Sequence, residues 1–572
     1  MASIQVRVSR GKKYWSIVES RRINGQPRTV ILEYLGTASS LLLRLRSGSS
    51  FAVRSYSHGD SAALINAAIE LDIVSIINKH IPQNRKMTKP TRDGLTVGAS
   101  LLLAAVGRAC HPTSKLGWYD WCQGTSLEYC LKRQFKDLDS QHFWDQMNAL
   151  PVNTIAAIED EIVKKLVQIY GIKLDCLFFD TTNFFTFIDS SNTRCDLPQR
   201  GRNKQHRYDL RQIGMALLVS RNDHFPLFHQ TYRGNKNDGT LFKEVFSALV
   251  SRLRMISSEI SKVTIVFDKG NNTKANFKLI DAEDGLYYVG GLVSSYFRDL
   301  ILEANSKFEI IEINGEPIPI YRIKRLVWGK ERTCLVTISK QLLEGQIKGI
   351  EQSLEKKFKL LEKLKRQLEN YKSRSTYDKK SLTLKIKKII HGQFVEDILK
   401  FEIFVLDTGK ISFSYFVSND AFDKLKKEIL GRKILVSNRH EWTPKEIIIA
   451  YRGQSNVEFA FKDMKNPYHL AIRPQFHWTD QKIEAHFFIC MIAFLLVVCV
   501  YSRAKNMCGY SHSMNQFMED LNRVRLTSIR KKSSNKINYQ LENIPKHLEL
   551  ILPALKISQE NLRHKLNFSD YT

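Results

Sequence analysis

Residues 174–187 read LDCLFFDTTNFFTF, a short and strongly apolar run in which Asp180 follows three large hydrophobic residues. Apolar runs of this length are typical of strands that are buried on both faces of a sheet. A second run, VTIVFDKG at residues 263–270, has the same character and places Asp268 directly after its apolar residues. We therefore predict two buried strands, each with a carboxylate at its end.

The segments between these runs predict the rest of the sheet. Residues 212–220 and 225–234 read as two further strands, and residues 238–256 as an amphipathic helix. The resulting order of three strands, a helix and a fourth strand opens an RNase H-like α/β fold, a mixed sheet flanked by helices. In that layout the first and fourth strands are neighbours, so Asp180 and Asp268 would meet at one edge of the sheet.

Two carboxylates that lie so close together repel each other unless a cation sits between them. Hard divalent ions such as Mg²⁺ prefer oxygen ligands, and two such ions activate the attacking oxygen and stabilise the leaving oxygen in phosphodiester chemistry. The alternative is that each Asp begins a turn, which is common for an Asp at a strand end. The pair in this strand order favours the metal site.

Residues 451–465, YRGQSNVEFAFKDMK, offer a third carboxylate, Glu458. The spacing of four apolar residues predicts a helix with one core face: Val457, Ala460, Phe461 and Met464. In a continuous helix, Tyr451, Glu458 and Lys465 would line one edge, because seven residues make nearly two turns. Glu458 could then complete a metal site, and Lys465 could hold a DNA phosphate. The alternative is a surface ion pair between Glu458 and Lys462.

Several stretches together resemble insertion-sequence transposases of the DDE type. The likeness is closest to the branch with a Y-x2-R-x3-E-x6-K signature and a long insertion before the Glu, and it covers nearly the whole chain. It is carried by FFDTTNFF around Asp180, GRNKQHRYDLRQIGMALLV (201–219), YRGNKNDGTLF (232–242), VTIVFDKGNN (263–272) and the segment that begins YRGQSNVEFAFKDMK.

The resemblance implies roles for individual residues. Asp180, Asp268 and Glu458 match the catalytic metal ligands, which hold two Mg²⁺ ions, with Mn²⁺ as a substitute. Tyr451 and Lys465 match the DNA-contacting Tyr and Lys of the signature. The Arg position is Gln454 here, which can hydrogen-bond a phosphate but carries no charge and makes no bidentate ionic contact. A terminal DNA hairpin intermediate is therefore less firmly implied than the metal site.

Charge supports a nucleic-acid partner. The chain has 87 Lys and Arg against 58 Asp and Glu, a formal net charge of +29. We expect double-stranded DNA, with no membrane association, and the alternative is a generally basic proteome. Between the two Asp residues lies a basic segment that would suit the DNA backbone or would merely be a solvated loop. Its candidate DNA contacts are Arg202, Lys204, Arg207 and Arg211.

The pattern along the chain predicts six parts. The RNase H-like core is interrupted by an α+β insertion whose long lysine-rich helix, 342–368, serves either the pairing of two copies or the packing of the insertion itself. The parts are a β-meander (1–55), a helical and DNA-binding region (56–170), the first part of the core (171–300), the insertion (301–444), the second part of the core (445–502) and a basic C-terminal tail (503–572).

The nine cysteines form no C-x-x-C pair, so neither a zinc site nor a disulfide framework is implied. The N-terminus has no apolar leader, and the apolar segment 487–501 is too short to span a bilayer comfortably, so we expect a buried helix there. These features favour a reducing cytosol, and the resemblance implies a prokaryotic cytoplasmic protein associated with the nucleoid.

The function expected from the sequence is that of an insertion-sequence transposase. It would bind the terminal inverted repeats of its element and target DNA as a homodimer, cleave DNA with divalent metal and transfer the strand. Two alternatives stay open: a catalytically impaired DNA-binding relic, and a nuclease without strand transfer.

Overall fold

The computed structural model describes residues 2–23, 26–46, 51–82, 92–203, 205–236, 238–257, 263–268, 270, 272–369, 378–407, 410–466, 468, 470–472, 476–531, 536–542 and 544–558. The chain forms two compact units. The first comprises Met1–Asn78, Gln83–Gln146 and Cys499–Thr572, and the second comprises Lys79–Pro82 and Met147–Val498.

The first unit begins with an antiparallel sheet, within the range (1–55) for which the sequence predicted a β-meander. Its order is β1 (Ala2–Ser9), β2 (Lys12–Ile23) and β3 (Gln26–Gly36), and α1 (Ala38–Arg46) follows. A helical region comes next, with bounds α2 (Gly59–Glu70), α3 (Ile73–Lys79), α4 (Val97–Cys110), α5 (Trp118–Gln123), α6 (Leu127–Leu131) and α7 (Ser140–Ala149).

Within the described residues, much of the segment 503–558 is folded, which corrects the prediction of a basic C-terminal tail (503–572). Strand β16 (Arg525–Lys531) lies between β17 (Ile537–Leu541) and the distant β4 (Phe51–Ser57), antiparallel to both. Helices α19 (Met514–Asn522) and α20 (Ile551–Ala554) bury apolar side chains in the same unit. The sequence did not reveal this because the strand's partner lies at the other end of the chain.

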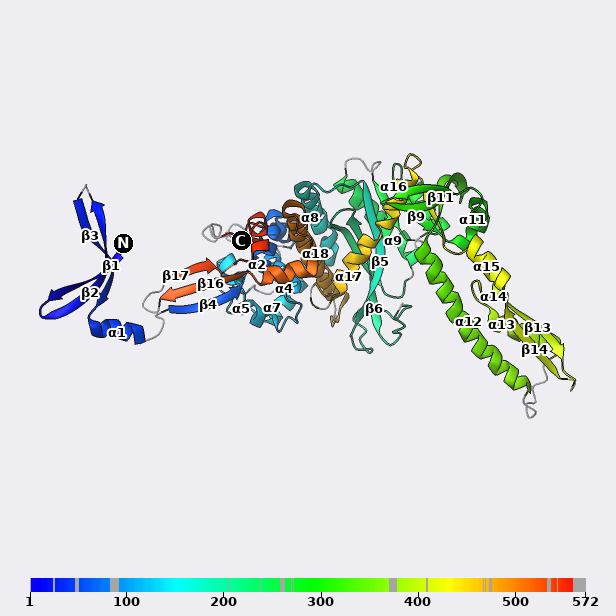
Figure 1. Cartoon of the computed structure of the whole chain (residues 1–572), viewed down its shortest axis with the longest axis horizontal. Helices are drawn as coiled ribbons and strands as arrows, with labels where there is room; N and C mark the ends of the chain where they lie inside the picture. Colours follow the sequence, from blue (N-terminus) through cyan, green and yellow to red (C-terminus); the bar gives the residue numbers. More distant parts are fainter. Residues whose placement is uncertain are drawn as a thin grey trace. The chain divides into compact units, whose positions relative to one another are not determined.

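The second unit is built on one large mixed sheet (Figure 1). Within the described residues its strands follow the order β10 (Glu309–Ile313), β11 (Glu316–Val327), β12 (Lys330–Ile338), β15 (Arg432–Ser437), β9 (Tyr287–Leu292), β8 (Thr264–Phe267), β5 (Cys176–Thr186), β6 (Arg211–Ser220) and β7 (Pro226–Arg233). β5 pairs in parallel with β8, and β8 with β9, whereas β6 and β7 are antiparallel additions at the other side.

Residues 301–444 differ from the separate subdomain that the sequence predicted. Strand β15 pairs antiparallel with β9, and β12 and β11 extend the sheet from there. The strands of the expected insertion at residues 309–338 and 432–437 therefore continue the core sheet. Pairing satisfies the backbone groups of β9 that an open edge would leave exposed.

The remainder of this segment is a helical excursion. It contains α12 (Lys340–Glu369), α13 (Lys379–Ile390), α14 (Val395–Ile398), the antiparallel pair β13 (Leu399–Val405) and β14 (Ile411–Val417), and α15 (Asn419–Glu428). The lysine-rich helix that the sequence predicted is α12. Its apolar side, with Leu354 and Leu361 buried, packs against α13, α14 and β14.

Helices cover both faces of the core strands. α9 (Asp238–Ile256) lies on one face, where Phe242 contacts Phe179 of β5 and Phe267 of β8. α10 (Lys274–Asp281) lies on the same face, and α8 (Ile155–Tyr170) packs beside α9. The other face receives α16 (Pro444–Arg452), α17 (Ser455–Lys465) and α18 (Asp480–Cys508) (Figure 1).

Helix α18 is longer than the apolar segment 487–501 suggested. In the described part of the chain it is the one helix whose length and composition would allow it to cross a membrane, but 94% of its most apolar stretch is buried. Burial of this extent is typical of the core helix of a globular protein.

Candidate active site

Strand pairing brings the two predicted aspartates together. β5 and β8 run parallel, with Phe179 opposite Phe267, so the next position along both strands holds Asp180 and Asp268. Asp268 follows the end of β8, as predicted. Asp180 does not end its strand, because β5 continues to Thr186 through its pairing with β6. It stands where β5 loses its β8 partner, and this exposes one side of the strand.

Alternation along β5 decides which face carries Asp180. Phe179 points to α9, so Phe178, Asp180 and Thr182 share the opposite face, where α17 lies. On β8 the same reasoning puts Phe267 on the α9 face and directs Asp268 to the other side, where it meets Tyr451 of α16. The side chains of Asp180 and Asp268 therefore lie on the same side of the sheet.

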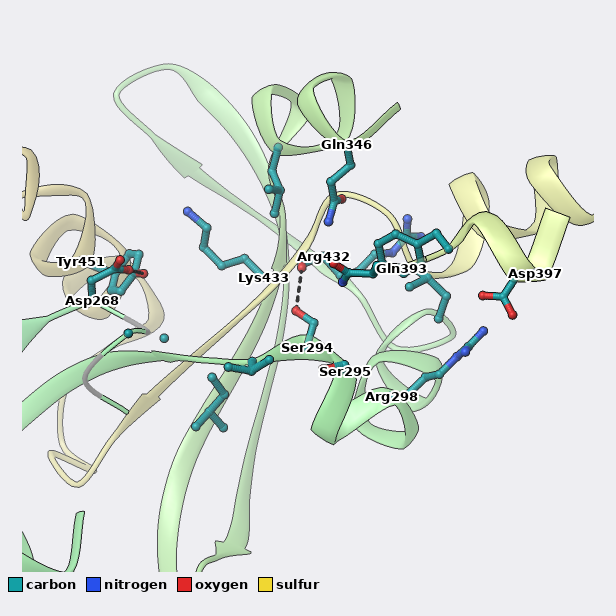
Figure 2. A pocket seen from close by; sticks show the side chains of 17 residues that line it. Asp268, Ser294, Ser295, Arg298, Gln346, Gln393, Asp397, Arg432, Lys433 and Tyr451 are labelled. Carbon is teal, nitrogen blue, oxygen red and sulfur yellow. Dashed lines mark hydrogen bonds between the residues drawn. The ribbon is translucent and has the colours of Figure 1, made fainter. Parts of the chain in front are cut away.

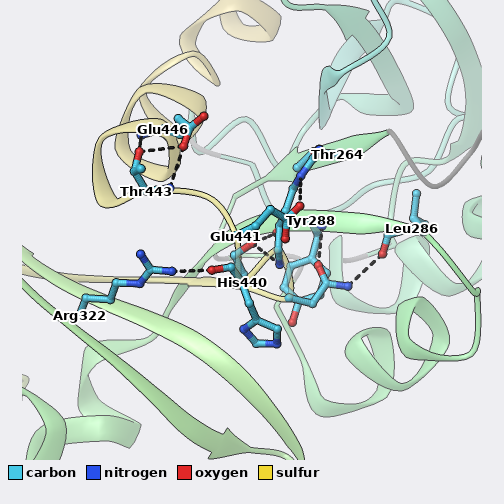
Figure 3. Close-up of polar contacts among 11 residues, drawn as sticks. Thr264, Leu286, Tyr288, Arg322, His440, Glu441, Thr443 and Glu446 are labelled. Atoms are coloured by element: carbon cyan, nitrogen blue, oxygen red, sulfur yellow. Dashed lines mark hydrogen bonds and ion pairs between the residues drawn. The ribbon is translucent and has the colours of Figure 1, made fainter.

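The start of α16 is fixed to the β8–β9 strands by polar contacts (Figure 3). Thr443 and Glu446 form a capping box, and Pro444 occupies the first turn. Just before them, Arg439 donates to the hydroxyl of Thr264 at 2.6 Å, and the side chain of Asn438 bonds the backbone of β9 and of the residue before it. These contacts anchor the segment that leads to Tyr451.

Residues 451–465 are not one helix, which corrects the sequence prediction. α16 ends at Arg452 and α17 begins at Ser455, so Tyr451 and Glu458 do not share a helix edge. Gly453 lies at the junction, where a Cβ atom would stand 2.4 Å from Cζ of Phe178. The missing side chain lets the chain approach β5 closely before α17 crosses it. Glu458 and Lys465 do lie on the same helix, two turns apart.

Glu458 is exposed and makes no hydrogen bond or ion pair with any described residue. The alternative of a surface pair with Lys462 is therefore not observed. Its carboxylate is close enough to Tyr451 to raise the pKa of that phenol, although burial and Asp268 have larger effects in the same direction. Glu458 is therefore near enough to the Asp268–Tyr451 contact for its charge to act on Tyr451.

Tyr451 donates its hydroxyl proton to Oδ1 of Asp268 at 3.3 Å, and the phenol is partly buried. Gly291 of β9 makes room for this arrangement, since a Cβ atom there would stand 2.8 Å from the hydroxyl oxygen. The sequence assigned Tyr451 to DNA. In the structure it contacts a candidate metal ligand instead.

Lys465 lies over the same face of β5 as Asp180. Its ammonium group hydrogen-bonds the hydroxyl of Thr182 and sits 5.2 Å from the ring centre of Phe184. The lysine is half-buried, and its partner Thr182 lies two residues along the strand from Asp180. The position of Thr182 could have been inferred from strand alternation, but its lysine partner could not.

The remaining predicted DNA contacts are placed less favourably. Gln454 is 8% exposed at the α16–α17 junction, so its amide does not face a surface that DNA could reach. Arg211 donates to the carbonyl oxygens of Ser190 and Asn192, and Arg207 pairs with Asp209.

Arg202 of the same basic segment is exposed on its loop. Lys204 lies outside the described residues. Of the three described candidates, Arg202 and Arg207 are exposed, whereas Arg207 and Arg211 each have a local partner.

Asn272 is a site residue that the sequence interpretation missed. It is buried, its side-chain amide donates to the carbonyl of Gly291, and its own Oδ1 has no described partner. The contact ties the segment after Asp268 to β9. No sequence signal identified it, because an Asn in a loop most often serves a turn.

The donor chemistry suits a hard divalent cation, because three carboxylates serve one side of the sheet. The set is not closed: within the described ranges, no three His, Cys, Asp or Glu side chains lie close enough together to hold a metal ion. Strand pairing unites Asp180 and Asp268, whereas Glu458 approaches them from a separate helix.

A family model described as the transposase DDE domain matches residues 185–496, more than half of the chain. The chain belongs to the transposase DDE domain family. The matched segment contains Asp268 and Glu458 and begins shortly after Asp180. The transposase is also similar to a cryo-EM structure of the piggyBac transposase synaptic complex with hairpin DNA, at 11% identity and a TM-score of 0.35, over 88% of this chain and 84% of that chain. No curated protein matches it.

Proposed function

We propose that this transposase uses an RNase H-like core to cut and join DNA strands, with Asp180, Asp268 and Glu458 as its catalytic carboxylates. The observation that carries the proposal is the parallel pairing of β5 and β8 in a register that aligns Asp180 with Asp268. The order β7–β6–β5–β8–β9 and the helix that brings Glu458 across β5 support the same conclusion.

Asp180, Asp268 and Glu458 would hold divalent cations, Mg²⁺ or Mn²⁺, which supply a Lewis acid for the attacking and leaving oxygens of a phosphodiester. The chain's own residues prepare this site. The Tyr451 hydroxyl donates to Oδ1 of Asp268 and orients that carboxylate. Lys465 offers a positive charge beside β5 that would attract a phosphate.

DNA is the substrate class that this chemistry and the net charge of +29 favour. We propose that the transposase acts on the ends of its own element and on target DNA, with two copies pairing two ends. Gln454 stands where the resembling group has an Arg. Because Gln carries no charge, this chain lacks that ionic contact with a phosphate for hairpin formation at the cut end.

The experiment is incubation of the full-length protein with Mg²⁺ and labelled DNA that carries the sequences flanking its gene. The proposal predicts a nick that leaves a 3′-hydroxyl at the element end, followed by a product joined to target DNA. Cleavage without a joined product would mean a nuclease. Binding without cleavage would mean an impaired DNA-binding protein, and either result would contradict the proposal.

A further inference from the structure

A pocket of about 780 Å³ opens beside Asp268, within the second unit (Figure 2). One wall comes from the end of β9 and the short helices that follow it, η5 (Ser294–Phe297) and α11 (Arg298–Ala304). The facing wall comes from α12, α14 and β15, and Asp268 and Tyr451 line one end. A volume of this size is typical of a ligand site and far exceeds the needs of a bare ion.

Two cationic side chains stand on the pocket walls. Lys433 extends from β15 with its ammonium 5.2 Å from the ring centre of Tyr451, which places a positive charge near the Asp268 end (Figure 2). Arg298 is exposed at the start of α11 and makes no hydrogen bond or ion pair with the residues that the structure describes. A third cation, Arg432, is committed to carbonyl groups of its own turn and to Asn305.

The pocket also offers neutral polar groups. Ser294 and Ser295 lie between the two cationic positions, and Gln346 and Gln393 face them from α12 and the segment before α14 (Figure 2). Asp397 is the acid across from Arg298, and it lies at the end farther from Asp268. The Asp268 end therefore combines a cation, hydroxyl groups and a candidate catalytic carboxylate.

The backbone at Phe394 provides an independent observation. This residue lines the pocket with φ 68° and ψ −20°, a left-handed conformation that is unfavourable for a bulky side chain. Strained residues of this kind persist where the surroundings hold them, and they concentrate at ligand sites. Phe394 is such a residue at the wall of this pocket.

We propose that this pocket is a DNA subsite in which Lys433 and Arg298 bind backbone phosphates of the strand that continues from the bond cut at Asp268. The inference rests on the proposed function. A phosphodiester chain fits because it presents anions at intervals along an extended path, as the two cations do, and because the pocket is continuous with Asp268. A free small anion would need only one of the cations.

The first test measures DNA binding as a function of salt, without divalent metal, for the wild type, Lys433→Gln and Arg298→Gln. Each phosphate contact makes the slope of log K against log[salt] more negative by about 0.7–0.9. For Lys433→Gln and for Arg298→Gln we expect a slope that corresponds to about one phosphate contact fewer than in the wild type. Lys433→Arg, which keeps the charge, should have the wild-type slope. Lys356→Gln, an exposed lysine of α12 outside the pocket, is the control and should keep the wild-type slope. Unchanged slopes for both pocket variants would overturn the subsite.

The second test replaces single phosphates near the cut site by neutral methylphosphonates. If Lys433 binds one of these phosphates, the methylphosphonate at that position weakens DNA binding by the wild type. It does not further weaken DNA binding by Lys433→Gln. Strictly additive effects at every position would overturn the proposal. A pocket for a free anion would instead bind inorganic phosphate in the absence of DNA. The wild type, but not Lys433→Gln, would then broaden the ³¹P line of inorganic phosphate. That result would also overturn the DNA subsite.

These outcomes separate the subsite from the proposed function. If the wild type cuts and joins DNA while the pocket variants show wild-type slopes and additive effects, the subsite is wrong and the function stands. If the wild type binds DNA with a Lys433-dependent slope but cuts nothing in Mg²⁺, the proposed function fails on its own.

Discussion

The contact between Tyr451 and Asp268 is a polar interaction that the sequence did not predict. A seven-residue spacing suggested that Tyr451 points the same way as Glu458. The break at Gly453 instead turns Tyr451 towards Asp268, where its hydroxyl lies 3.3 Å from the carboxylate. A donor in this position orients a metal ligand, and such partners are commonly worth 10–100-fold in activity.

Replacing Tyr451 by Phe removes the donor while keeping the ring. We expect DNA cleavage to fall by about 10–100-fold, with DNA affinity little changed, because the hydroxyl acts on Asp268 and not on DNA. Burial and the nearby carboxylates raise the pKa of Tyr451, so its hydroxyl stays protonated up to at least its usual pH of ionisation. Cleavage rates measured from pH 6 to 9 should show no loss from this group.

The matched control is Tyr468→Phe, since Tyr468 is 78% exposed. It should leave both rate and affinity unchanged. A Tyr451→Phe enzyme that cuts DNA at the wild-type rate would show that the hydroxyl does not position Asp268.

Gly453→Ala tests the close approach of α17 to β5. The new methyl group would meet Phe178 at 2.4 Å, so we expect a loss of about 1–3 kcal/mol in the free energy of unfolding, measured by denaturant titration. Gly345→Ala is the control, because nothing lies within 4 Å of its position in α12; it should gain up to about 1 kcal/mol. Equal effects of the two substitutions would mean that Gly453 is not needed for this contact.

At the scale of elements, periodicity identified what local packing controls. The strands around Asp180 and Asp268, the helix 238–256 and the long helix α12 follow from apolar spacing, because each buries its own pattern. What failed depended on partners distant in the chain: the pairing of β15 with β9, and of β16 with β4. The sequence did not predict these pairs, because no local pattern in a strand shows which distant strand it hydrogen-bonds.

Helix α17 carries a half-buried acid, Asp463, whose titration should be visible in stability. Burial raises the pKa of Asp463 to about 6 from 3.8, against the smaller opposing effect of Lys462. The folded state therefore binds the proton more tightly than the unfolded state. The stabilising contribution is full below about pH 4 and is lost as pH rises through 6.

We expect the wild type to lose about 1–3 kcal/mol more stability than Asp463→Asn between pH 4.5 and 7. Urea titrations of both proteins in metal-free buffer would measure this difference. An identical pH dependence in the two proteins would contradict the assignment.

Helix α12 offers a test of how the excursion is held together. Leu361 is fully buried whereas its neighbour Leu360 is 49% exposed. Leu361→Ala should cost about 2–5 kcal/mol in the unfolding of the second unit, because a cavity is left, and Leu360→Ala less than about 1 kcal/mol. Similar losses would place the contact surface of α12 elsewhere, including on a second copy of the chain.

At the scale of the whole molecule, the sequence predicted that Asp180 and Asp268 lie on neighbouring strands, and the pairing of β5 with β8 confirms that placement. The role of the three carboxylates as one metal site stays a prediction. Asp180 and Asp268 were placed together because strand order alone dictates their neighbours. Glu458 was assigned through resemblance, and its true approach depends on the α16–α17 break. Gln454, expected at a phosphate, is buried because that break turns it inward.

The central claim is that Asp180, Asp268 and Glu458 act as one divalent-metal site. The most direct measurement is the rate of Mn²⁺-dependent DNA nicking by Asp180→Asn, Asp268→Asn and Glu458→Gln, each first shown to bind DNA like the wild type. We predict that each loses more than about 100-fold, since even supporting residues around metals cost 10–100-fold, and that Glu351→Gln on the exposed face of α12 loses nothing. Nicking at the wild-type rate by any of the three variants would contradict the claim.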